Sequence, residues 1–267
     1  MALDIEKLKQ LQKKLNDEAL KEIYEELPEN LIKLSKNNIL NYCLQDFKSG
    51  IKDEHSTSTR VINSWLNQGI LKINDEDKGK IRRFNRIENI WLNIVIEARK
   101  FGIPLEALTK SRTELLESPI KDFSLLKFGV LETLFRSPKM ILITADGNTK
   151  LISLDSYAKW MSKGMFPTHI NFKLSDYIAL EYPKNALSID FNIQNLYEDK
   201  NKMMLLYFLK TGDYNHIKLH ISDNDVRIIE DSNVLSKNQE LMQIISDWSF
   251  KKVTIVINDK VETSINI

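Results

Sequence analysis

Apolar residues recur at helical spacing in the first half of the chain and at strand spacing in the last third. The longest stripe predicts a helix over 87–101 whose buried side is Ile87, Ile90, Trp91, Ile94, Val95, Ala98 and Phe101. A shorter helix is predicted over 58–68, with Ser58 as N-cap and with an inward side made by Val61, Ile62, Trp65 and Leu66. A third is predicted over 37–47, with Leu40, Cys43, Leu44 and Phe47 facing inward. Together these helices predict one folded unit over 37–110.

The first 36 residues predict a helical extension. Its apolar positions are three or four residues apart, and Pro28 ends the pattern: Leu8, Leu11, Leu15, Ala19, Ile23 and Leu27. Two interpretations stay open. The helix packs on the neighbouring domain, or it forms a coiled coil with a second copy, although the pattern covers only about three heptads.

Two further helices are predicted over 105–116 and 123–135, and they make 111–137 a connecting segment. From Lys139 onward the spacing changes to that of strands. A hairpin is expected around Asp146-Gly147, followed by a helix over 155–163 and a strand over 168–174.

The last third contains a weak repeat. Residues 201–230 and 237–265 each have the pattern helix, strand, turn, strand, at an offset of 36 positions. Two such units predict one four-stranded antiparallel sheet with helices on one face. The predicted fold class is therefore α+β, with an all-α, winged-helix part before an α+β domain over 138–267.

A basic tip lies between the helices at 58–68 and 87–101. Nine positions carry five cations and no acidic residue: Lys78, Lys80, Arg82, Arg83 and Arg86. Gly79 suits the turn of a hairpin there. The whole chain has a net charge of +1, but 37–110 holds 12 Lys/Arg against 9 Asp/Glu, a local charge of +3. This distribution is typical of a nucleic-acid-binding segment.

Helix, turn, basic hairpin tip and helix, in this order, resemble the winged helix-turn-helix domain of the MerR family of transcription regulators. The matching positions are Trp65, Gly69-Ile70-Leu71, Arg82-Arg83-Phe84 and the turn Arg99–Glu106. The chain departs from the family pattern by an insertion of roughly six residues near 49–55, by Asn63 in place of the usual Arg and by Phe84 in place of Tyr. The resemblance implies sequence-specific binding of double-stranded DNA, a homodimer, and an effector or protein partner at the C-terminal domain.

Two groups of side chains are candidates for this contact. Short polar groups and one Arg on the outward side of 58–68 suit base edges and phosphates in the major groove: Ser58, Thr59, Arg60, Asn63, Ser64 and Asn67. The cations of the basic tip suit the adjoining phosphate backbone. The alternatives are an ordinary solvated helix face and a protein-interaction or scaffold protein that uses a winged-helix fold without DNA.

The sequence offers little chemistry for catalysis. His216 and His220 would lie about 13 Å apart along a strand, too far to hold one metal together. Phosphate-binding glycine loops, nucleophile motifs and cysteine clusters are absent, so we expect no enzyme, cofactor or metal. The residues Tyr157, Trp160, Met161, Met165 and Phe166 have the spacing of a helix core more than of an effector pocket.

Compartment is predicted from three features. The N-terminus is charged from the start, no apolar run is long enough to span a membrane, and Cys43 is the single cysteine. Together they favour a cytoplasmic protein without membrane contact.

Overall fold

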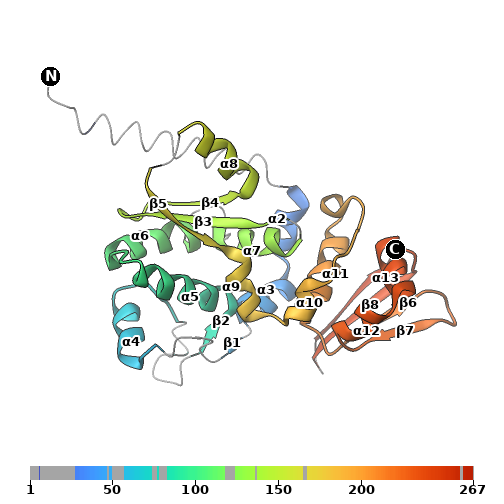
Figure 1. Cartoon of the computed structure of the whole chain (residues 1–267). Helices are drawn as coiled ribbons and strands as arrows, with labels where there is room; N and C mark the ends of the chain where they lie inside the picture. The colour runs from blue at the N-terminus through green and yellow to red at the C-terminus, as the bar shows by residue number, and fades with distance from the viewer. Residues whose placement is uncertain are drawn as a thin grey trace.

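The computed structural model describes residues 28–46, 48–49, 57–73, 77, 83–117, 124–135, 137–164, 167–258 and 261–266, together with Glu6. Helices and antiparallel sheets are mixed along the chain, which confirms the α+β class (Figure 1). The predicted helix before Pro28 and the predicted hairpin tip at Gly79 lie outside the described residues.

The region predicted as one helix over 37–47 contains two kinds of helix, one after the other. After α2 (Glu29–Ser35), the short α3 (Asn38–Asn41) continues as a π-helix, η1 (Tyr42–Asp46). Asn37 caps α3, because its Oδ1 accepts from the amide of Ile39 at 2.9 Å. Strand β1 (Lys48–Ser49) then pairs antiparallel with β2 (Phe84–Asn85), so the start of the inserted segment borders the last residues of the basic tip.

Four helices follow: α4 (Thr59–Asn67), α5 (Arg86–Lys100), α6 (Leu105–Leu116) and α7 (Leu125–Phe135). The predicted stripe on α5 is buried, with one correction. Phe101 is 61% exposed because α5 ends at Lys100 and the chain turns at Gly102. Burial also extends beyond the stripe, to Asn89 and Asn93 on other sides of α5, and α7 is buried nearly all round. Helices α5 and α7 therefore lie in the interior of the protein, and α7 is more than the connecting helix that was predicted.

The predicted hairpin forms the first of two larger sheets. Strands β3 (Lys139–Thr144), β4 (Thr149–Ser153) and β5 (His169–Lys173) lie in the order β4-β3-β5, all antiparallel. Helices α6 and α7 lie below this sheet in Figure 1, and α8 (Leu154–Ser162) lies above it.

A correction concerns α8. None of its residues is buried, and Met161 is 47% exposed, so the expected core role of Tyr157, Trp160 and Met161 is wrong for this helix. Met165 and Phe166 lie outside the described residues.

The C-terminal third confirms the predicted four-stranded sheet. After α9 (Leu174–Glu181), α10 (Lys184–Ser188) and η3 (Leu196–Glu198), the first repeat unit is α11 (Lys200–Thr211), β6 (His216–His220) and β7 (Val226–Ile229). The second is α13 (Gln239–Ser246), β8 (Lys252–Asn258) and β9 (Val261–Asn266), preceded by α12 (Ser232–Lys237). The strand order is β7-β6-β8-β9, so the two hairpins meet through β6 and β8. Helices α12 and α13 lie over the sheet, whereas α11 packs against α2, α7 and α10 (Figure 1).

One continuous hydrophobic core joins these parts. Buried residues from Leu31 to Ile265 belong to a single cluster that crosses every predicted boundary. Polar contacts cross the boundaries too. Lys127 of α7 is buried and donates from Nζ to the carbonyl of Ser35 at 2.7 Å and to Oδ1 of Asn41. Helix α7, which lies within the segment predicted as connecting, is thus part of the interior.

The buried ammonium of Lys127 gives the first testable prediction. Burial is the main cause that lowers its pKa to about 8, while Asp46 opposes the shift. The unfolded chain therefore binds more protons than the folded chain between pH 8 and the ordinary lysine pKa near 10.5. The free energy of unfolding contributed by Lys127 should rise with pH across this window, by about 3 kcal/mol in total, and be constant below pH 7.

Urea unfolding at pH 7 to 9.5 of the natural chain and of Lys127→Met measures this. Cys43 and the buried tyrosines, which have raised pKa values, lower the stability of both chains alike at the alkaline end. The difference between the chains should therefore shift in favour of the natural chain as pH rises. A pH-independent difference would contradict an ammonium held at a lowered pKa.

Candidate nucleic-acid interface

Helix α4 presents the side predicted for it, with one exception. The Ser58 hydroxyl accepts from the Val61 amide at 3.4 Å, so Ser58 is the N-cap. Ile62 and Trp65 are buried, and the exposed side chains are Thr59, Arg60, Val61, Asn63, Ser64 and Asn67. Val61, predicted inside, is 37% exposed, because the core reaches only the side of α4 that carries Ile62 and Trp65. The outward face is polar except for this valine.

The chain leaves α4 through a glycine turn. Gly69 has φ of +73°, a left-handed conformation that glycine adopts without a steric penalty. The amide of Ile70 then donates to the carbonyl of Trp65 at 2.9 Å, and Ile70 and Leu71 return into the core. The turn therefore ends α4 and returns the chain to the core.

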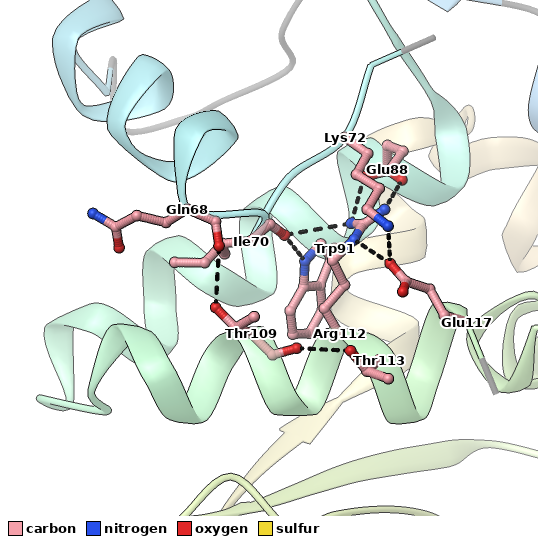
Figure 2. A network of polar contacts seen from close by, with 9 residues as sticks. All are labelled: Gln68, Ile70, Lys72, Glu88, Trp91, Thr109, Arg112, Thr113 and Glu117. Carbon is pink, nitrogen blue, oxygen red and sulfur yellow. Dashed lines mark hydrogen bonds and ion pairs between the residues drawn. The ribbon is translucent and has the colours of Figure 1, made fainter.

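Side chains of α5 and α6 hold this turn (Figure 2). The carbonyl oxygen of Ile70 accepts from the Trp91 indole at 2.7 Å and from Nη1 of Arg112 at 3.3 Å. The Thr109 hydroxyl donates to the carbonyl of Gln68 at 3.5 Å. Backbone groups just after α4 are thereby tied to two helices of the core.

Arg112 is the centre of this network. Its side chain is 4% exposed, and its guanidinium contacts both carboxylate oxygens of Glu88, at 2.5 and 2.9 Å. Nε of Arg112 lies 3.3 Å from Glu117, which also pairs with Lys72 at 2.5 Å. The Lys72 ammonium, followed by Arg112, lowers the pKa of the Glu117 carboxyl. A bidentate pair of this kind fixes the orientation of the two side chains as well as their distance. It therefore holds the Arg112 guanidinium in place beside the Ile70 carbonyl, just after α4.

Two described residues of this region carry an exposed positive charge, one on α4 and one just before β2. Helix α4 contains no acidic residue. Arg60 is exposed on its first turn, and Arg83, just before β2, is exposed as well. Lys78, Lys80 and Arg82 lie outside the described residues, so their predicted positions stay predictions.

Arg86 is the predicted site residue that the structure places elsewhere. Its side chain is 12% exposed, forms an ion pair with Asp213, and lies with its guanidinium carbon 4.6 Å from the centre of the Tyr182 ring. The hydroxyl of Tyr207 donates to the same carboxylate at 2.7 Å. We call these four residues the Arg86 joint. A guanidinium held inside it is not available to a phosphate backbone, because α5 begins at Arg86 and turns its side chain into the core.

Sequence reasoning missed the residues that orient α4. Glu88 and Arg112 are 24 positions apart, and Trp91 was assigned only to the core stripe. An indole N–H needs a partner when buried, which is the one signal that Trp91 offered.

No protein-family model, curated protein or solved structure matches this chain significantly. Within the residues that the structure describes, no group of three or more His, Cys, Asp or Glu side chains could hold a metal ion. None of the described helices combines the length and apolar character needed to cross a lipid bilayer.

Proposed function

We propose that the protein is a sequence-specific DNA-binding transcription regulator of the MerR-like type. One observation carries the proposal: α4 exposes a carboxylate-free polar face, and its end is locked to the core by Ile70, Trp91 and Arg112. A helix that enters the major groove needs both a face of short polar and cationic groups and a fixed orientation. Arg60 and Arg83 supply described surface cations on either side of the turn, and the basic tip adds Lys78, Lys80 and Arg82 by sequence.

Salt dependence of DNA binding tests the proposal. The double variant Arg60→Ala with Arg83→Ala should weaken binding to random duplex DNA. If both side chains contact phosphates, the slope of log K against log salt should fall by about 2, because each lost contact contributes about 0.9. Fluorescence anisotropy between 50 and 200 mM salt measures both quantities.

The matched control is Arg227→Ala. This arginine is 47% exposed in its side chain but lies in β7, on the opposite side of the molecule from α4 in Figure 1. It should leave the slope unchanged. An equal loss in both variants would point to unspecific attraction to the whole protein, and a natural chain without affinity at low salt would refute DNA binding.

A second candidate function has one observation in its favour. The net charge of 37–110 is only +3, a small excess that favours docking on another protein over binding DNA. A protein-interaction or scaffold role predicts no affinity for random duplex at low salt. The same anisotropy measurement therefore separates the two functions.

A further inference from the structure

A cleft of about 720 Å³ lies between α7, α9 and α10. This volume falls in the range of pockets for small molecules, roughly 300–1,000 Å³. Its apolar floor includes Leu134, Phe135 and Ile178. Hydroxyl, amide and charged groups surround the floor, which is the usual composition of a small-molecule site.

The charged groups of the cleft favour an anion. The lining contains two lysines, Lys184 and Lys210, and one carboxylate, Asp190, so its net charge is +1. Lys210 is fixed in place, because its ammonium donates to the carbonyl of Leu187 at 3.2 Å and to that of Ile189. Lys184 is exposed at the first position of α10 and is able to reach a ligand. Ser175, whose hydroxyl donates to Oδ1 of Asp176 at 3.3 Å, and Ser188 also line the cleft.

Two chain segments that line the cleft continue into the Arg86 joint. Ala179 of α9 lines the cleft, and three residues later the Tyr182 ring stacks on the Arg86 guanidinium. Lys210 of α11 lines it too, and three residues later Asp213 pairs with Arg86. Arg86 itself follows β2 and begins α5, the helix that carries Glu88 and Trp91. The cleft and the Arg86 joint therefore share two chain segments, 179–182 and 210–213.

We propose that this cleft binds a small organic anion, carrying a carboxylate or a phosphate, and that its occupancy acts through the Arg86 joint on the surface made by α4 and Arg83. The second half of this proposal rests on the proposed DNA-binding function. The first half stands without it.

Calorimetric titration of the full chain with inorganic phosphate, citrate and AMP tests the site. At least one probe should bind saturably, and putrescine, a cation, should not. Lys184→Glu should weaken binding at least about tenfold, because it replaces an attractive charge by a repulsive one. The control Lys200→Glu makes the same change at the first residue of α11, outside the lining, and should bind the probe as the natural chain does. Absence of binding by all three anions, or equal losses in both variants, would overturn the site.

The regulatory half is read in the anisotropy assay at fixed ionic strength. A saturating probe should change the affinity of the natural chain for duplex DNA at least threefold, and the change should vanish in Lys184→Glu. Probe binding with unchanged DNA affinity would overturn the coupling and leave the site. Probe binding by a chain that shows no DNA affinity would refute the proposed function and the coupling with it, again leaving the site.

Discussion

Replacing Arg112 by Met should destabilise the protein by about 3–5 kcal/mol, because it leaves the carboxylate of Glu88 buried without its guanidinium. The carbonyl of Ile70 loses one of its two donors in the same step. The large effect comes from the unpaired charge more than from the lost attraction. Removing both partners, in Arg112→Met with Glu88→Leu, should therefore cost less than the single change.

Chemical denaturation measures these free energies, and Arg227→Met is the control. Arg227 pairs with Asp225 at 2.7 Å, but the two side chains are 47% and 39% exposed, so its loss should leave the free energy of unfolding almost unchanged. Hydrogen exchange provides a second readout. The amides of α4 should exchange faster in Arg112→Met and at the natural rate in Arg227→Met, because Arg112 bonds to the turn after α4 and Arg227 does not. Equal costs for the two arginines would show that Arg112 does not hold the turn.

Replacing Gly147 by Ala should destabilise the protein by about 3 kcal/mol. The added Cβ would lie 2.4 Å from the carbonyl oxygen and 2.7 Å from Cα of Ala107, and neither backbone atom of α6 is able to yield easily. Gly147 also has φ of +82°, a conformation that costs other residues roughly 1–2 kcal/mol. The Ser111 hydroxyl donates to the Gly147 carbonyl at 3.2 Å, so the hairpin tip would have to leave α6 to relieve the clash.

Thermal unfolding checks this prediction, and the expected fall in Tm is roughly 6–12 °C for a chain of this size. Gly164→Ala is the matched control. Its φ is +63°, but no other atom lies within 4 Å of the added Cβ, so only the backbone cost applies. Equal losses in the two variants would mean that the contact between the hairpin and α6 is not tight in solution.

Much of the local structure could be predicted from the sequence, because it depends on neighbouring residues. Helix α6 begins and ends where the apolar spacing and Pro104 place it, and Gly147 marks the β3–β4 turn. The 36-residue offset predicts both C-terminal hairpins and the sheet that they form. Even the outward side of α4 follows from its period, apart from Val61.

The fate of charged side chains could not be predicted in this way. Arg83 and Arg86 belong to the same basic run. Arg83 is exposed, whereas Arg86 pairs with Asp213, 127 positions away. Lys127 has its partners near residue 40, and Arg112 has its own on α5. Periodicity predicts which side of a helix or strand is apolar. Whether a charged side chain is buried depends on a partner residue from another part of the chain.

The sequence by itself therefore determined helices α4 to α8, α11 and α13, the antiparallel hairpins, and the polar composition of the helix proposed to meet DNA. Each of these depends on spacing within a few turns or strands. Only the tertiary structure decided which cations remain at the surface, how α4 is held, and that one core joins the parts predicted as separate. The physical reason is that an ion pair or a buried ammonium forms between residues whose distance along the chain carries no information about their distance in space.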